Sequence, residues 1–351
     1  MQAAVTTGNL REITLQEVPT PEVQTGMLLL KTAYCSVCGT DLEYLDNTLA
    51  YREGGALHAG AILGHEFCAE VVEVGAGITD WEVGDRATTS GFRGICGECY
   101  FCRRRLFQLC LGKEHERSIY TQIPQGGYGN RSGAMAEYIV RAPHQLLKLP
   151  DHVSSAEGAL VEPLSVGVGA VEAAEIRPGD TAVVIGAGKI GLGTMRVAKV
   201  AGASRVIAVD LHPNRLQTAL QMGADVVLNP KEVDLIPEVV RMTNAGPDVL
   251  IICVRDGQVL NTAVDMVRRG GKIVIVGQIP PTEVNPGMWI VKQLRFEAVL
   301  GRTPMITALN LIASGQVDVT PMISEVLPLK DVQRAFDALW SGENIVSLLQ
   351  P

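Results

Sequence analysis

The fold of this 351-residue chain is decided by the stretch TAVVIGAGKIG, residues 181–191. Its first five residues are an apolar run typical of a buried strand, and three glycines follow with the spacing Gly-x-Gly-x-x-Gly. The residues beyond, to about Val200, have the composition of a helix. A strand that enters a helix through such a turn predicts a parallel βαβ unit that binds a dinucleotide.

Each glycine of this turn has a separate task. Gly186 permits the tight turn, Gly188 lets backbone amides approach a pyrophosphate at the helix N-terminus, and Gly191 lets the helix lie close to the sheet. A second strand-like run ends in Asp210, 24 positions after Gly186. Its carboxylate is expected to accept hydrogen bonds from the ribose hydroxyls and to repel a 2′-phosphate, which favours NAD over NADP. Arg215, five residues further on, is the one feature that points the other way.

Two regions of different texture predict two domains, as the chain length does. Up to about Pro150, short extended runs such as residues 28–32 and 70–74 are broken by turns, which indicates an irregular β domain. After Pro150, strands alternate with amphipathic helices, which indicates a doubly wound parallel sheet and an α/β fold. Helices are expected near residues 306–314 and 329–339.

A candidate metal site centres on Gly64-His65-Glu66, which follows an apolar run. Cys38 lies on its N-terminal side and Glu162 on its C-terminal side. One thiolate, one imidazole and one or two carboxylates suit zinc, with room for an exchangeable water or substrate oxygen. A Gly-His-Glu triplet alone is more often a loop histidine beside a solvated acid, so the indication comes from the combination.

A second candidate metal site comes from cysteine spacing. Four of the eight cysteines fall within fifteen residues: Cys96, Cys99, Cys102 and Cys110. Four thiolates around one ion form a closed, structural site. The alternatives are free thiols, a redox pair or, by spacing alone, a ferredoxin-like cluster. Disulfides fit less well because these cysteines lie closer together than a disulfide framework would favour and no export signal is visible in the sequence.

The overall charge argues about partners. With 38 acidic and 30 basic residues the formal net charge is -8, which disfavours nucleic acid or an anionic membrane surface as the main partner. The basic run 103–105 is interpreted as a solvated loop. No apolar run approaches the roughly 18 residues that span a bilayer. We therefore expect a cytoplasmic protein that acts on a small molecule.

In combination these motifs resemble the zinc-containing medium-chain dehydrogenases, and among them the sorbitol, polyol and threonine dehydrogenases. The resemblance covers nearly the whole chain. It implies a GroES-like irregular β-barrel catalytic domain at residues 1–153 and 297–351, with a structural zinc lobe at about 93–113. It also implies a Rossmann NAD-binding domain at residues 154–296, two zinc ions per chain and a homo-oligomer, either a dimer or a tetramer.

The resemblance assigns roles to individual residues. Cys38 and His65 become firm ligands of the catalytic zinc, Glu66 binds directly or through water, and Glu162 stands where dehydrogenases of simple alkanols have cysteine. The cofactor contacts that we expect are Gly186, Gly188, Lys189, Ile190, Gly191, Asp210, Arg215 and Gly277.

Further roles concern the proton and the substrate. Thr40 is the expected first acceptor of the alcohol proton, and Asp41 is expected to orient His65. Glu43 stands where related enzymes often carry a relay histidine, and we expect this carboxylate to be exposed to solvent. Tyr44 and Arg302 are the expected substrate-binding residues.

The implied reaction is hydride transfer from a secondary alcohol to NAD, giving a ketone, with zinc as Lewis acid. The expected substrate is a polyol, a cyclitol or an amino alcohol. One alternative is a zinc-free enone or quinone reductase on the same fold, which would lack the metal ligands. Another is a nucleotide-sensing or nucleic-acid-binding protein that uses the four-cysteine lobe as a ribbon.

Overall fold

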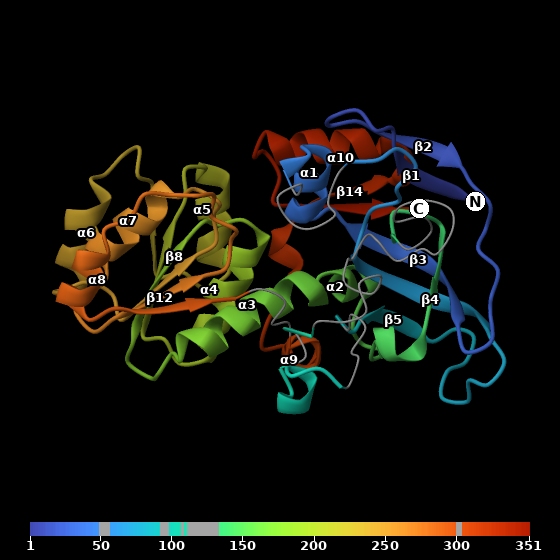
Figure 1. The fold of residues 1–351 in the computed structure, drawn as a ribbon, viewed down its shortest axis with the longest axis horizontal. Coiled ribbons are helices and arrows are strands. Elements are labelled where there is room, and N and C mark those ends of the chain that lie inside the picture. Colours follow the sequence, from blue (N-terminus) through green and yellow to red (C-terminus); the bar gives the residue numbers. More distant parts are fainter. Residues whose placement is uncertain (49–56, 92–97, 107–108, 111–132, 300–303) are drawn as a thin grey trace. The chain divides into compact units, whose positions relative to one another are not determined.

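A computed structural model of the chain describes residues 1–48, 57–91, 98–106, 109–110, 133–299 and 304–351. These residues form two compact units (Figure 1). The first unit combines Met1–Glu162 with Ile323–Pro351, and the second is Pro163–Met322. A first unit that needs both ends of the chain agrees with the predicted arrangement. The limits of the compact units differ from the predicted domain limits at residues 153 and 297, which remain a proposal.

The first unit is built on a seven-stranded sheet with the order β14-β15-β3-β4-β5-β7, in which β6 also pairs with β3. Its strands are β3 (Leu28–Ser36), β4 (Glu66–Val74), β5 (Arg86–Thr89), β6 (Tyr138–Arg141), β7 (Leu146–Lys148), β14 (Ile323–Pro328) and β15 (Val346–Gln350). All pairs are antiparallel except β14 with β15. A separate antiparallel pair is formed by β1 (Gln2–Thr6) and β2 (Ile13–Glu17).

Short helices complete the first unit. They are α1 (Gly39–Leu45), α2 (Ser155–Ala159) and α10 (Val332–Trp340), with one-turn 3₁₀ segments that include Cys102–Arg104. The expected helix at 329–339 corresponds to α10 and the turn before it. The core of this unit is one apolar cluster that includes the fully buried Leu28, Leu30, Phe67, Ile139 and Phe336.

The second unit contains a six-stranded sheet in which every pair is parallel. The order is β10-β9-β8-β11-β12-β13, so the chain winds outward from β8 in both directions. The strands are β8 (Thr181–Ile185), β9 (Arg205–Val209), β10 (Val226–Leu228), β11 (Val249–Ile252), β12 (Lys272–Ile275) and β13 (Arg295–Ala298). In such a sheet a ligand binds beyond the carboxyl ends of the strands, where the winding reverses.

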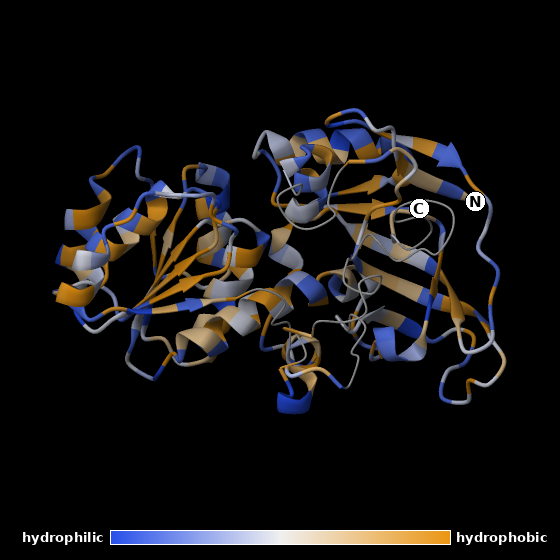
Figure 2. Ribbon diagram, viewed as in Figure 1, coloured by the Kyte–Doolittle hydropathy of each residue, from blue (hydrophilic) through white to orange (hydrophobic). Residues whose placement is uncertain are grey.

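Helices precede, connect and follow the parallel strands of the second unit. They are α3 (Val161–Ala174), which begins in the first unit, α4 (Lys189–Val200), α5 (Pro213–Gln221), α6 (Leu235–Thr243), α7 (Gln258–Met266), α8 (Pro286–Lys292) and α9 (Met305–Ala313). Figure 2 shows the central strands as predominantly hydrophobic, and all four residues of β11 are buried. Strands covered by helices on both faces need such continuous apolar runs.

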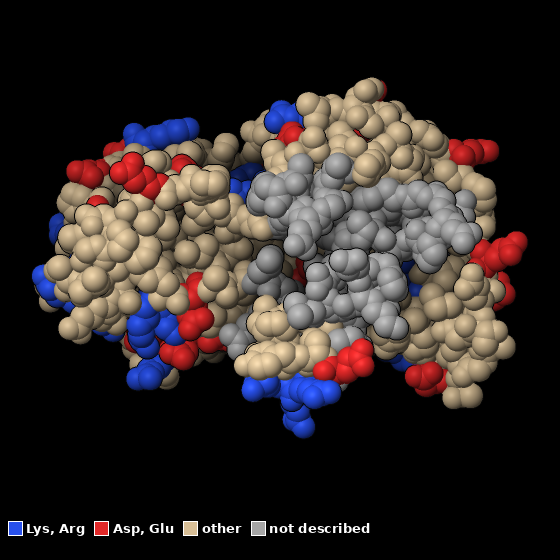
Figure 3. Space-filling view, in the orientation of Figure 1, with Lys and Arg blue, Asp and Glu red and all other residues tan. Residues whose placement is uncertain are grey.

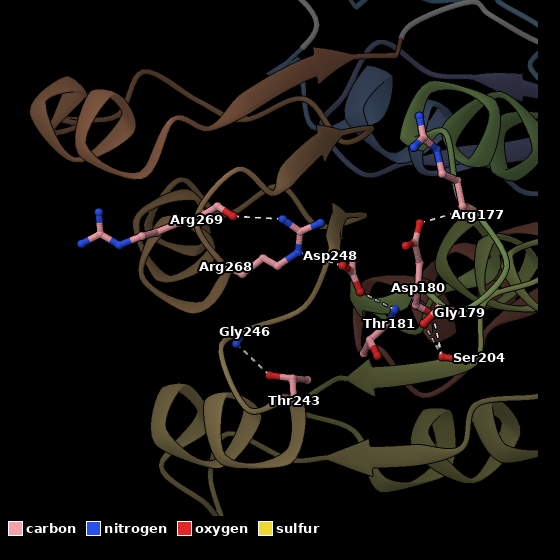
Figure 4. A network of polar contacts seen from close by, with 10 residues as sticks. All are labelled: Arg177, Gly179, Asp180, Thr181, Ser204, Thr243, Gly246, Asp248, Arg268 and Arg269. Carbon is pink, nitrogen blue, oxygen red and sulfur yellow. Dashed lines mark hydrogen bonds and ion pairs between the residues drawn. The ribbon is translucent and has the colours of Figure 1, made fainter.

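A polar network joins the strand starts at the opposite end of this sheet (Figure 4). Asp248, just before β11, accepts hydrogen bonds from the Thr181 amide at 2.8 Å and from Nε of Arg268 at 2.7 Å. Ser204, just before β9, donates its hydroxyl to the Asp180 carbonyl at 3.1 Å. The network aligns the amino ends of the strands, while the glycine turn lies at the carboxyl end of β8.

Charged side chains are dispersed over the second unit. On the face shown in Figure 3, acidic and basic groups alternate on this unit without forming one broad basic surface in the part of the chain that is described. Among the described residues, no helix is long and apolar enough to cross a membrane.

Candidate active site

Three of the predicted ligands meet in the first unit. The ligand atoms of Cys38, His65 and Glu66 all lie within 4.8 Å of one another. Cys38 is the N-cap of α1, and the other two come from the turn that opens β4. Gly64 has φ +98°, and a Cβ there would lie 2.6 Å from Sγ of Cys35, so the turn that presents His65 requires glycine.

The N-terminus of α1 organises this site through a capping box. The Cys38 amide donates to Oδ2 of Asp41 at 2.9 Å, and the Thr40 amide donates to Sγ of Cys38 at 3.4 Å. The Thr40 hydroxyl oxygen lies 3.6 Å from the same sulfur. These contacts fix the position of the Cys38 sulfur, and the thiolate of a cysteine is a ligand that metal ions bind.

Negative groups surround the imidazole of His65. Its Nδ1 lies 3.6 Å from Oδ1 of Asp41, whose side chain is fully buried. Burial lowers the pKa of His65, but Cys38 and Asp41 raise it more, so this pKa lies well above its usual value. An environment that favours a cation on the imidazole also favours a divalent metal in its place.

Glu162 lies outside the close group of three ligands. It stands in the first turn of α3 and is partly exposed. The first compact unit ends at this residue, so Glu162 belongs with the other three ligands in that unit. The structure therefore brings together three of the four expected ligands of the catalytic site.

Two residues of α1 that have predicted roles, Glu43 and Tyr44, are both buried. Glu43 was expected to be solvent-exposed but is only 6% exposed. Tyr44 is fully buried in the core, and its hydroxyl accepts a hydrogen bond from the His58 amide at 3.0 Å. The helix buries these positions because it packs its inner face into the unit's core. Arg302 lies outside the described residues.

The cysteine lobe also assembles as a group. The sulfur atoms of Cys99, Cys102 and Cys110 lie within 4.8 Å of one another, with 4.0 Å between those of Cys99 and Cys110. The Cys102 amide lies 3.5 Å from Sγ of Cys99. Cys96, the fourth predicted ligand, lies outside the described residues.

The glycine turn of the second unit has the predicted form. Gly186 has φ +99°, and a Cβ on Gly191 would lie 1.8 Å from the Gly186 carbonyl oxygen. A Cβ on Gly188 would meet no atom within 4 Å. Packing within the chain thus explains two of the glycines, whereas the third borders open space, as expected where a ligand approaches the backbone.

Asp210 closes this turn. Its Oδ2 accepts a hydrogen bond from the Ala187 amide at 2.7 Å, and its Oδ1 accepts one from the His212 amide at 2.9 Å. The carboxylate is 9% exposed. The strand-to-acid spacing in the sequence indicated Asp210, but its bond to the turn itself was not foreseen.

The other expected cofactor residues lie around the same sheet end. Lys189 and Ile190 open α4 directly after the turn, and Arg215 lies partly buried in α5. Gly277 follows β12, and a Cβ there would lie 2.5 Å from the Val254 carbonyl oxygen. Gly277 is thus explained by close packing of two loops.

Comparison with protein-family models gives two matches. Residues 24–151 match the model described as alcohol dehydrogenase GroES-like domain, and residues 190–314 match the model described as zinc-binding dehydrogenase. The first covers the β-rich region with Cys38, His65 and Glu66, and the second covers most of the parallel sheet. The predicted pairing of a GroES-like domain with a Rossmann-type sheet is confirmed.

Individual proteins agree with this match. Sorbitol dehydrogenase of Bacillus subtilis (strain 168) is 31% identical over 98% of this chain and 95% of its own length. An alcohol dehydrogenase, TADH, from Thermus sp. ATN1 has a TM-score of 0.85 and 32% identity, covering 100% of this chain and 99% of that one. A putative zinc-binding dehydrogenase from Sinorhizobium meliloti 1021, solved with NADP bound, has a TM-score of 0.87 and 27% identity, with 100% and 99% coverage.

The similarity to sorbitol dehydrogenase spans both compact units, and the residues that it covers include both candidate metal sites and the glycine turn. A zinc-free reductase or a nucleic-acid-binding protein would not need the close group of Cys38, His65 and Glu66. The chain belongs to the zinc-type medium-chain dehydrogenase family.

Proposed function

We propose that this protein oxidises a polyhydroxylated secondary alcohol to a ketone with NAD as hydride acceptor. The observation that carries the proposal is the meeting of Cys38, His65 and Glu66 within 4.8 Å. Its family membership and the similarity to a sorbitol dehydrogenase support oxidation of an alcohol. A cyclitol or an amino alcohol carries the same chemical group and belongs to the same proposed class.

The donor set fits zinc. A thiolate, an imidazole and a carboxylate are ligands that zinc accepts in tetrahedral sites, and three protein ligands leave a position for an exchangeable oxygen. The hard carboxylate of Glu162, where dehydrogenases of simple alkanols have a thiolate, suits a substrate with several hydroxyl groups. Glu162 is proposed as a further ligand that reaches the site from the first turn of α3.

When bound, zinc supplies a Lewis acid at the alcohol oxygen and NAD supplies the hydride acceptor. The chain's own residues hold the thiolate and handle the proton. The Thr40 hydroxyl, 3.6 Å from the Cys38 sulfur, accepts the alcohol proton as it gives up its own proton to the cofactor ribose or to water, and Asp41 fixes the orientation of His65. Because Glu43 is buried, a carboxylate at this position can take the proton next only if water or the cofactor ribose reaches it.

The proposed preference for NAD rests on Asp210. Its two oxygens hold the turn through the Ala187 and His212 amides, so a negative charge is fixed beside the position expected for the adenosine ribose. A 2′-phosphate would have to approach this charge. The neighbour solved with NADP makes a direct comparison of the two cofactors necessary.

Two zinc ions per chain are proposed, one in each sulfur-containing group. The cysteine lobe would be a closed site and the catalytic site an open one. No disulfide links any two of the seven cysteines that the structure describes, which suits metal binding in a reducing compartment and the proposed cytoplasmic location. Cell fractionation would check the location.

A homo-oligomer is proposed as the working form. In the second unit, β13 is the last strand of its sheet, and on α8 the side chains of Ile290 and Val291 are 77% and 53% exposed. Exposed apolar side chains near an open sheet edge are typical of an interface. Light scattering of an Ile290→Asp variant should show a smaller assembly than the native protein, and a monomeric native protein would contradict the proposal.

The activity is tested by following NADH formation with sorbitol, xylitol, a cyclitol, 2,3-butanediol, threonine and ethanol. We expect turnover with at least one vicinal diol and little with ethanol. Cys38→Ser should abolish this turnover while the protein keeps its thermal transition. Full activity of Cys38→Ser, or reduction of enones in preference to oxidation of alcohols, would contradict the proposal.

A further inference from the structure

Gly158 is a buried glycine inside α2, and its backbone does not require glycine. The residue has an ordinary right-handed helical conformation, in which alanine would be the better helix former. The space around it gives the reason. A Cβ would lie 3.0 Å from Sγ of Cys68, 3.1 Å from Cβ of Cys68 and 3.0 Å from a methyl carbon of Leu149.

Cys68 connects this contact to the metal site. It lies on β4 two residues after Glu66, the first residue of the strand, so the two side chains share one face. Its side chain is completely buried.

The start of α2 is held in place. The guanidinium of Arg86 donates to the carbonyl oxygens of Val153 at 2.8 Å, Asp151 at 2.9 Å and Pro150 at 3.1 Å. Ser154 then caps the helix through a capping box with Glu157. A displacement at Gly158 therefore cannot be absorbed on the N-terminal side of the helix.

The other end of α2 leads directly to Glu162. The helix ends at Leu160, which leaves the helical region with φ -99° and ψ 2°, and α3 begins at Val161. Ala159, Leu160 and Val161 are fully buried, so this joint is packed on all sides. Glu162 follows in the first turn of α3, four residues after Gly158.

We propose that the contact between the Cys68 thiol and Gly158 sets the distance of Glu162 from Cys38, His65 and Glu66. Cys68 and Gly158 are then positioning residues of the metal site. The inference rests on the proposed role of Glu162 as a zinc ligand.

The test compares four proteins: wild type, Gly158→Ala, Cys68→Ala and the double variant. The methyl group added in Gly158→Ala should push α2 off β4 and carry Glu162 away from the site. We expect the dissociation constant of the exchangeable zinc, measured by competition with a chelator, to rise about 10- to 100-fold in Gly158→Ala. The visible spectrum of the cobalt-substituted protein should change as well.

The double variant separates positioning from general damage. Removing the Cys68 sulfur makes room for the new methyl group, so zinc affinity should return most of the way to the wild-type value. Cys68→Ala alone removes the sulfur from this contact and should weaken zinc binding less than Gly158→Ala, because Arg86 and the buried residues 159–161 still hold α2. Gly287→Ala, at an exposed position of α8, controls for the effect of alanine on a helix. Zinc in the cysteine lobe should be retained in all variants.

Two outcomes would overturn the inference. One is an unchanged zinc affinity in Gly158→Ala, and the other is a double variant no better than Gly158→Ala. The variant Glu162→Gln tests the proposed zinc-ligand role of Glu162 separately from the proposed positioning by Cys68 and Gly158. If Glu162→Gln weakens zinc binding but Gly158→Ala does not, only the proposed positioning role of Cys68 and Gly158 is wrong. If Glu162→Gln changes neither zinc binding nor turnover, the proposed ligand role of Glu162 is wrong, and so is the positioning role of Cys68 and Gly158 that rests on it.

Discussion

Thr40 provides the sharpest prediction about a single residue. Its hydroxyl lies 3.6 Å from the Cys38 sulfur and its amide donates to the same atom, so removal of the hydroxyl leaves the amide contact intact. We expect Thr40→Ala to lose most of its turnover, with an effect of about 100-fold or more for a lost proton acceptor, and Thr40→Ser to keep much of it. Metal content should be unchanged in both variants.

Steady-state kinetics with deuterated and protiated alcohol would check this prediction. A Thr40→Ala enzyme that turns over at the wild-type rate, with a full isotope effect on hydride transfer, would show that the proton leaves by another route. Glu66 would then be the better candidate for the base.

Asp210 provides a second residue-scale prediction. Asp210→Ser should weaken NAD binding, because each lost charge-assisted hydrogen bond contributes about 1.5 to 3 kcal/mol, and it should improve the relative use of NADP. The ratio of kcat/KM for the two cofactors measures both effects. Asp265→Ser, which removes an exposed acid from α7, is the matched control for net charge. A wild-type enzyme that already prefers NADP tenfold would refute the assignment.

Sequence patterns located the candidate ligands better than their surroundings. Cys38, His65 and Glu66 could be proposed as ligands because few residue types bind zinc and each stood in a short, recognisable motif, and the structure brings their ligand atoms together. The burial of Glu43 and Tyr44 could not be found, because α1 has only seven residues and so shows less than two turns of any pattern. A charged residue in so short a segment is expected at the surface unless tertiary contacts override that expectation.

At the scale of elements, Asp225 links a helix to a strand. Its Oδ2 accepts a hydrogen bond from the Val206 amide at the start of β9 at 2.7 Å, and Lys199 of α4 lies 3.0 Å away. Burial raises the pKa of Asp225, but these donors lower it more, so the net pKa is below its usual value. The carboxylate therefore stabilises the folded state above the pKa of the unfolded chain.

Asp225→Asn should accordingly lower the thermal transition at neutral pH. The difference from wild type should shrink as the pH falls through the lowered pKa of Asp225, because both proteins then carry a neutral group there. Thermal unfolding between pH 3 and pH 7, about the range over which a carboxyl group titrates, would measure it. A difference that is independent of pH would show that the charge does not contribute.

Element prediction worked where local pattern and packing agree. The strand Thr181–Ile185 and the helix up to Val200 are confirmed, because a buried parallel strand and an amphipathic helix each leave a periodic signature. The return of the chain to the first domain at about residue 297 remains a proposal. The compact second unit extends to Met322 and includes β13, which pairs with β12. The partner of an edge strand is non-local information that its own four residues do not contain.

At the scale of the whole molecule, the two sulfur-containing groups should differ in their response to metal loss. We expect about two zinc ions per chain, one removed readily by a chelator and one held tightly. Cys38→Ser should lose the first ion and all activity but keep its fold. Cys99→Ser should lose the second and show lower stability and solubility. Elemental analysis combined with thermal unfolding would check both variants, and full zinc content in both would contradict the assignment of sites.

The position of β15 has a consequence for how the protein is made. This strand lies between β14 and β3 in the sheet of the first unit, and Leu348 pairs with Ser36 across most of the chain. During synthesis the contiguous segment Pro163–Met322 can fold as soon as it leaves the ribosome, whereas the unit that begins first must wait with an open sheet edge until Val346–Gln350 arrives. A chain that ends at Met322 and has been released from the ribosome should therefore protect the second unit from protease while the older N-terminal part is still cut.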